Sequence, residues 1–158
     1  MTEQSTFPSV HTLADLAIIL AYQEDTSQLE ATLQAEGFDV EVQRAQYSEL
    51  ELSYSRSFRG FLNHLAAWRQ AVDRDTYTVI MESDFVPCVG FGRAPAPFDP
   101  QRHGPNAWSF LYAGGPRIIW AHADGSMEGH AACPVAILIS PETAKKLVRF
   151  GEEELTRI

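Results

Sequence analysis

Two carboxylates stand two positions apart directly after a β-branched, apolar run. The run covers residues 76–81 (TYTVIM), and Glu82, Ser83 and Asp84 follow it. Side chains alternate in an extended backbone, so residues two apart point to the same face. Paired carboxylates can hold Mg²⁺ or Mn²⁺, and such a cation could grip a diphosphate and stabilise a leaving nucleotide. Taken alone, the triplet fits two solvated acids at a strand end equally well.

The predicted helix that precedes this run carries three further candidate site residues, a histidine and two arginines. An apolar stripe with three- and four-residue spacing predicts this helix over residues 55–73, and His64 lies one turn before Trp68 on it. A helix of a βαβ unit runs antiparallel to its strands, so we expect His64 below the carboxyl edge of the sheet, in a structural role. Arg56 and Arg59, near the start of the helix, are candidate anion contacts or charges that serve solubility alone.

A polar segment at 122–130 (HADGSMEGH) holds four potential metal ligands, His122, Asp124, Glu128 and His130. Their spacing matches no motif of fixed geometry, so a glycine-containing turn is favoured over a transition-metal site. A metallohydrolase built on this segment is the weaker alternative. His130 stays a candidate for an additional metal ligand.

The remaining pattern alternates strands with helices. It predicts strands at 16–22, 38–43 and 76–81 and helices at 27–36 and 55–73, followed by strands at 108–112, 117–121 and 133–139 and a last helix that opens with Ser140 and Pro141. This order is typical of an α/β fold with a mostly parallel sheet flanked by helices. No linker divides the chain, so we expect a single domain over residues 1–158, with a flexible start at 1–13.

The stretch from 87 to 116 differs from the rest, because six of the nine prolines and five of the ten glycines lie in it. Long loops of this kind are usually functional lids or disordered segments.

Composition narrows the classes of partner. The formal charge of −9 would repel a phosphate backbone, so nucleic acid is not expected as a partner. Two cysteines form no disulfide framework, which favours a reducing, cytoplasmic setting. No run of 18 apolar residues predicts a transmembrane segment. An anionic ligand would need a local arginine or lysine, a helix N-terminus or a bridging cation.

Four segments, in register over about residues 58–148, resemble the family 25 glycosyltransferases, the lipopolysaccharide and collagen galactosyltransferase group. Residues 59–68 (RGFLNHLAAW) are similar to its Gly-Cys-x-x-Ser-His-x-x-x-Trp stretch, and residues 79–86 (VIMESDFV) to its strand ending in Glu-Asp-Asp-Val. Residues 107–114 (AWSFLYAG) resemble Trp-Asp-x-x-x-Leu-Gly, and residues 135–147 (VAILISPETAKKL) resemble Tyr-x-Ile-Ser followed by Ala-Lys-Lys-Leu.

The resemblance implies a GT-A-like, Rossmann-related domain that binds a UDP-sugar donor with Mn²⁺ or Mg²⁺. Glu82 and Asp84 match the outer acids of the metal-binding triplet, with His130 as the candidate extra ligand, while Arg56, Arg59 and His64 are the candidate donor contacts. The acceptor would be a glycan or a lipid-linked, lipopolysaccharide-type molecule, which allows peripheral association with a membrane.

The departures from the family pattern keep a second interpretation open. Ser83 replaces the central Asp, Asn63 replaces Ser and Gly60 replaces Cys. The family's base-binding residues after the first strand are not matched, and no catalytic base is identified, since the family continues past the position of Ile158. The alternative is a GT-A-like binding or scaffold module without activity.

Overall fold

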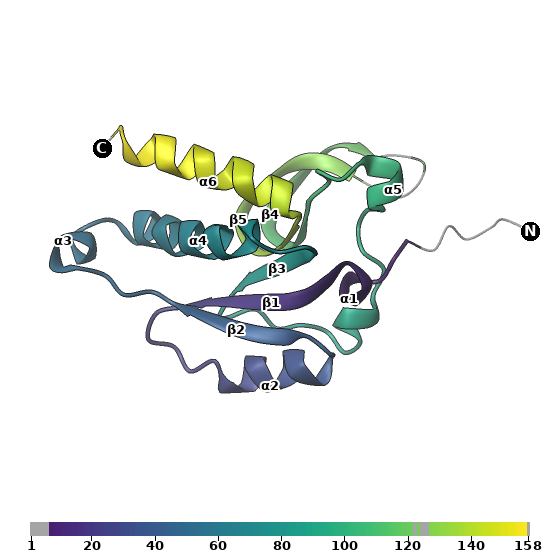
Figure 1. Cartoon of the computed structure of the whole chain (residues 1–158), viewed down its shortest axis with the longest axis horizontal. Helices are drawn as coiled ribbons and strands as arrows, with labels where there is room; N and C mark the ends of the chain where they lie inside the picture. Colours follow the sequence, from purple (N-terminus) through teal and green to yellow (C-terminus); the bar gives the residue numbers. More distant parts are fainter. Residues whose placement is uncertain (1–6, 122, 124–126, 158) are drawn as a thin grey trace, which may run out of the picture.

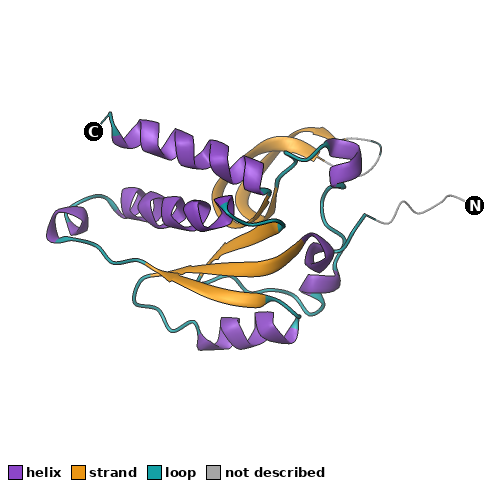
Figure 2. Ribbon diagram, viewed as in Figure 1, coloured by secondary structure: helices purple, strands orange, loops and turns teal. Residues whose placement is uncertain are grey.

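Five strands form one mixed sheet with helices on both faces (Figures 1 and 2). The computed structural model describes residues 7–121, 123 and 127–157. The elements are α1 (Val10–Leu13), β1 (Ala14–Ala21), α2 (Ser27–Ala35), β2 (Asp39–Arg44), α3 (Glu49–Leu52), α4 (Arg56–Val72), β3 (Tyr77–Glu82), the 3₁₀ turn η1 (Phe91–Arg93), α5 (Pro100–His103), β4 (Ser109–Ala121), β5 (Met127–Ile139) and α6 (Pro141–Leu155).

The long helices begin where the sequence places capping residues. Ser55 accepts a hydrogen bond from the Phe58 N–H at the start of α4, and Ser140 accepts one from the Thr143 N–H at the start of α6. Gly37 follows α2 with φ of 97°, a conformation that favours glycine. The predicted helices at 27–36 and 55–73 and the helix opening at Ser140 are therefore confirmed.

The strand order is β2-β1-β3-β5-β4. β1 pairs in parallel with β2 and β3, as the predicted βαβ units require. β5 runs antiparallel to both of its neighbours, β3 and β4, so four of the five strands share one direction. The predicted mostly parallel α/β sheet is confirmed. The predicted strands at 108–112 and 117–121 are instead one strand, β4, whose pairing with β5 contains several register shifts.

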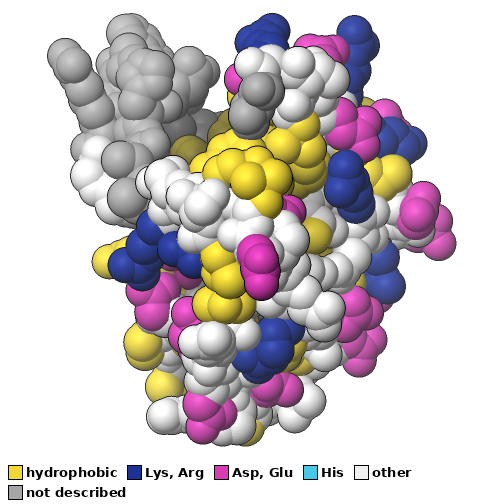
Figure 3. Space-filling view, turned by 90° about the vertical axis from the view of Figure 1, so that its left-hand side faces the viewer, with side chains coloured by type: hydrophobic (Ala, Val, Ile, Leu, Met, Phe, Trp, Pro, Cys, Tyr) yellow, Lys and Arg dark blue, Asp and Glu magenta, His cyan; other side chains and the backbone are white. Residues whose placement is uncertain are grey.

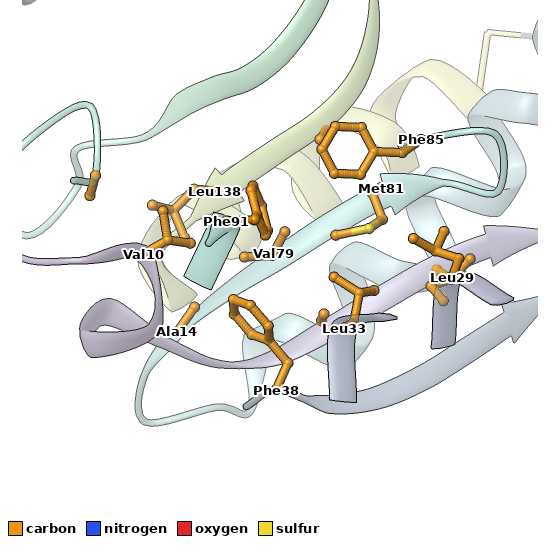
Figure 4. Close-up of a cluster of buried hydrophobic side chains, with 14 of the residues drawn as sticks. Val10, Ala14, Leu29, Leu33, Phe38, Val79, Met81, Phe85, Phe91 and Leu138 are labelled. Atoms are coloured by element: carbon orange, nitrogen blue, oxygen red, sulfur yellow. The ribbon is translucent and has the colours of Figure 1, made fainter. Parts of the chain in front are cut away.

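The sheet separates two buried clusters, as expected of strands that are apolar on both faces. On one face α4 and α6 cover alternate residues of the strands, among them Ile18, Ile80 and Ile139. On the other face α2 supplies Leu29 and Leu33 to a second cluster (Figure 4). α2 and α4 therefore lie on opposite faces of the sheet.

The 87–116 segment is packed and is not a lid over the carboxyl edge. Phe91, Ala96 and Phe98 are buried in the cluster that contains α2. The Glu36 carboxylate at the end of α2 accepts hydrogen bonds from the Gly90 and Gly92 N–H groups at 2.8 and 3.1 Å. The segment thus helps to cover the sheet on the face where α2 is the only long helix among the described residues.

The start of the chain differs from the expectation of a flexible 1–13 segment. Ser9 caps α1, and Val10 is buried in the core. The Val10 N–H donates to the Ala94 carbonyl, and the Ala96 N–H donates to the Pro8 carbonyl. Residues 8–13 are therefore attached to the domain.

Candidate functional site

The strand order places a topological switch point at the carboxyl ends of β1 and β3. From β1 the chain crosses through α2 to β2 on one side, and from β2 it crosses through α4 to β3 on the other side. Where the two connections diverge, no crossover covers the strand ends, and open α/β sheets bind ligands at such switch points. Glu82, the last residue of β3, lies at this point.

Helix α4 places three polar side chains across the ends of three strands. The Arg59 guanidinium carbon lies 5.8 Å from the ring centroid of Tyr47, which follows β2. Asn63 donates a hydrogen bond from Nδ2 to the carbonyl of Ala21, the last residue of β1, at 3.1 Å. His64 Nε2 lies 3.8 Å from Glu82 Oε1 at the end of β3.

His64 therefore lies at the carboxyl edge, and the expectation that it sits below that edge is wrong. A 17-residue helix is about 25 Å long, whereas a six-residue strand spans about 20 Å. α4 also begins beyond the ends of the strands (Figure 1). Its middle residue consequently reaches the level at which β3 ends.

The extended backbone that would align Glu82 with Asp84 ends at Glu82. Ser83 and Asp84 form a turn that is closed by a 3.1 Å hydrogen bond from the Phe85 N–H to the Glu82 carbonyl. The alternation rule of a strand does not extend through this turn. Both acids remain accessible, since Asp84 is exposed and the Glu82 side chain is 42% exposed.

Arg59 is a cation without a carboxylate partner among the residues that the structure describes. Its backbone carbonyl accepts a 2.8 Å hydrogen bond from the Tyr47 hydroxyl, which fixes this turn of α4 against the chain after β2. Burial raises the pKa of Tyr47, and the neighbouring Arg59 charge opposes the rise. Arg56, the first residue of α4, is exposed. Both arginines thus lie in the first turn of α4, which begins beyond the ends of the strands.

Buried polar atoms without a hydrogen-bond partner gather on α4. Within the described part of the chain there are four such side-chain atoms, and three belong to α4: Arg59 Nε, Asn63 Oδ1 and Trp68 Nε1. An unsatisfied buried polar atom costs about 1–3 kcal/mol. The sequence motifs did not single out Asn63 as a site residue. The available signal was a polar amide on the otherwise apolar, sheet-facing side of an amphipathic helix.

The loop after β1 is fixed by Arg44, which no sequence motif singled out either. Its guanidinium donates to the Glu24 carbonyl at 3.0 Å and to Thr26 Oγ1 at 3.2 Å. The Glu24 carboxylate in turn accepts from the Tyr22 N–H at 2.6 Å. Arg44 therefore holds the loop after β1 in place and is not a free anion contact.

The candidate ligand His130 lies on β5, outside the part of that strand that pairs with β3. On β5 it is paired with Arg117 of β4, whereas the part of β5 that pairs with β3 is Ala136–Ile139. The side chains of Glu128 and His130, and all of His122 and Asp124, lie outside the described residues. Across the described parts of the chain, no three His, Cys, Asp or Glu side chains are grouped closely enough to hold a metal ion.

Two surface depressions lie at the opposite, amino-end edge of the sheet. One of about 390 Å³ is lined by residues at the starts of β3 and α6, including Tyr77 and Ser140. Another of about 400 Å³ is lined by residues before β1 and on α5. In the first, Arg74 is paired with Asp15 and Lys145 with Glu142, so these cations are already neutralised.

The surface on the side of α3 mixes both signs of charge with hydrophobic side chains (Figure 3). This face therefore lacks the continuous basic stripe that a nucleic-acid backbone requires. No helix among the described residues is long and apolar enough to cross a membrane. Neither a protein-family model nor a curated protein matches the chain.

Proposed function

We propose that the chain is a glycosyltransferase-like domain that binds a nucleotide sugar, with UDP as the nucleotide, at the carboxyl ends of β1 and β3. Glu82, with Asp84 as the second carboxylate, would hold a divalent cation, Mn²⁺ or Mg²⁺, and that cation would neutralise charge on the diphosphate. The observation that carries the proposal is the position of Glu82, half-exposed at the topological switch point. The sugar is then transferred to a glycan or a lipopolysaccharide-type acceptor, as the resemblance to family 25 implies.

The charges at this edge support an anionic ligand bound through a cation. Glu82 and Asp84 alone would repel a diphosphate, so its binding here would need a divalent cation held by these carboxylates. Mg²⁺ and Mn²⁺ in phosphate sites often use one or two carboxylates and complete their coordination with phosphate oxygens and water. Arg59 and Arg56 supply positive charge on the α4 side of the same edge. Cation and nucleotide should consequently bind cooperatively.

Calorimetric titration of UDP and several UDP-sugars, with and without Mn²⁺, tests the proposal. We expect binding that requires the cation and that weakens at least about tenfold in Glu82→Gln, and also in Asp84→Asn, because each variant removes a charged ligand. Glu41→Gln, an exposed acid on β2, is the matched control. Binding that ignores the cation, or that survives Glu82→Gln, would contradict the metal bridge.

A non-catalytic binding module of the same fold is the second candidate. Val86 and Val89, just after the Glu82 turn, are 86% and 97% exposed, and exposed apolar residues gathered together often mark interaction surfaces. Donor hydrolysis and sugar transfer separate the two candidates. Turnover that disappears in Glu82→Ala while the circular dichroism spectrum is retained would exclude the non-catalytic module.

A further inference from the structure

We propose that His64 and Glu82 together form the cation site and that this pair selects a transition-metal ion over Mg²⁺. The inference rests on the proposed function in placing a cation at Glu82, and it deepens that function by assigning the partner ligand and the class of ion. Asp84, which lies in the turn after Glu82, is then a secondary contact. The proposal needs no nucleotide for its test.

The separation of the two side chains suits a shared ion better than a direct bond. A hydrogen bond between a nitrogen and an oxygen has a length of about 2.7–3.2 Å, and His64 Nε2 lies 3.8 Å from Glu82 Oε1. Two ligands held about 2.1 Å from one ion are about 3.4 Å apart at a tetrahedral angle and about 4.2 Å apart when opposite each other. The observed separation falls inside this range.

The chemistry of the pair determines which ions fit. Imidazole nitrogen binds Zn²⁺, Co²⁺ and similar transition ions well, and Mn²⁺ accepts both imidazole and carboxylate, whereas Mg²⁺ strongly prefers oxygen. A site built from Glu82 and Asp84 alone would be an all-oxygen site and would hold Mg²⁺ and Mn²⁺ comparably. Of these two ions, the His64–Glu82 pair instead favours Mn²⁺ over Mg²⁺.

The surroundings hold the imidazole in place and leave the carboxylate accessible. The His64 side chain is 15% exposed, and its ring centroid lies 5.9 Å from that of Trp68, one turn further along α4. Glu82 is more exposed and lies at the switch point, so water or phosphate oxygens could reach an ion that this side chain would hold. One ligand is therefore preorganised and the other can adjust.

Titration of the full-length chain with Mn²⁺ alone, followed by electron paramagnetic resonance, tests this assignment. The loss of the free-ion signal gives the affinity, and pulsed measurements detect nitrogen coupled to the bound ion. We expect nitrogen coupling in the wild type. In His64→Phe, which keeps a ring beside Trp68, we expect that coupling to disappear and the affinity to fall on the order of tenfold. Glu82→Gln should weaken binding similarly.

The control is His103→Gln, which removes an imidazole from α5. It should keep both the affinity and the nitrogen coupling of the wild type. If His64→Phe does not fold, as judged by circular dichroism, His64→Gln replaces it, since glutamine at this position cannot produce the imidazole coupling.

Each outcome separates this inference from the proposed function. Nitrogen coupling that disappears with His64, in a protein that does not bind UDP, supports the site and overturns the nucleotide proposal. UDP binding that is equal with Mg²⁺ and Mn²⁺, without nitrogen coupling, overturns the role of His64 and leaves the nucleotide proposal standing. Absence of bound Mn²⁺ at millimolar concentration also overturns the inference.

Discussion

Replacing Asn63 with leucine is expected to leave the free energy of unfolding unchanged or to raise it, although Asn63 is buried and hydrogen-bonded. Its Nδ2 donates to the Ala21 carbonyl at 3.1 Å, while its Oδ1 has no partner among the described residues. The Ala21 carbonyl also accepts a 2.8 Å hydrogen bond from the Ala45 N–H. Losing the Asn63 amide therefore leaves no orphaned carbonyl behind.

The magnitude follows from three terms. The lost hydrogen bond is worth about 0.5–1.5 kcal/mol, and removing the unpartnered Oδ1 recovers about 1–3 kcal/mol. Leucine adds apolar area at a position that is only 8% exposed. We expect a net gain of about 0–2 kcal/mol, which in a chain of this size corresponds to a melting temperature between unchanged and roughly 8 °C higher.

Urea denaturation monitored by circular dichroism measures this difference, and Thr78→Val is the matched comparison. Thr78 is fully buried in β3, and within the described structure its hydroxyl has no partner, so valine removes an orphaned polar atom without breaking a bond. We expect a gain of about 1–3 kcal/mol there. A loss above about 1 kcal/mol in Asn63→Leu, beside a gain in Thr78→Val, would show that Oδ1 is satisfied in solution. A loss in both would refute the reasoning.

Three further predictions concern helix packing, pH dependence and charge. Gly151→Val should destabilise the fold by about 1–3 kcal/mol in thermal denaturation, because a Cβ there would lie 2.8 Å from buried Leu65 Cδ1. The hydrogen bond from the Gly90 N–H holds the pKa of Glu36 below its ordinary value near 4.5. The Glu36 carboxylate therefore stabilises the fold above pH 4.5, and this stabilisation is lost as the pH falls through the lowered pKa. Glu36→Gln should flatten the decline of unfolding free energy between about pH 5 and 3. Arg59→Met should weaken UDP binding roughly tenfold or more in calorimetry.

Each of these variants has a control in the same chain. Gly60→Ala, where a Cβ meets nothing within 4 Å, should stabilise α4 by about 0.5–1 kcal/mol. Glu41→Gln should keep the wild-type decline of stability with acid. Arg149→Met, on α6, should bind UDP like the wild type. A stable Gly151→Val, an unchanged acid response in Glu36→Gln or full UDP affinity in Arg59→Met would contradict the respective prediction.

The elements with strong local signals were predictable from the sequence. Serines 55 and 140 mark helix starts through caps, and β1 is apolar on both faces because helices or loops cover both. These signals depend on a few neighbouring residues. Strand direction depends on distant partners instead, so the antiparallel pairing of β5 with β3 and β4 was not visible in residues 133–139 themselves.

The composition of the 87–116 segment pointed to a lid or a disordered segment, because proline and glycine indicate backbone shape and not burial. Three of its apolar side chains, Phe91, Ala96 and Phe98, fill the core beside α2. Their partners lie far away in the sequence, and Glu36, which anchors Gly90, is 54 positions earlier. Such contacts between distant residues cannot be predicted from a local sequence pattern.

In the candidate site, too, features set by neighbouring residues were predictable and contacts between distant residues were not. Glu82 at a strand end could be derived from the apolar run before it, whereas its neighbour in space could not. Alternation paired Glu82 with Asp84, but a turn begins after Glu82, and the side chain recorded beside its carboxylate is His64 on a helix that overhangs the strands. A carboxylate pair and a carboxylate–imidazole pair bind different ions. Ion preference therefore tests which neighbour matters: equal affinity for Mg²⁺ and Mn²⁺ favours the sequence motif, and a preference for Mn²⁺ that disappears with His64 favours the three-dimensional contact.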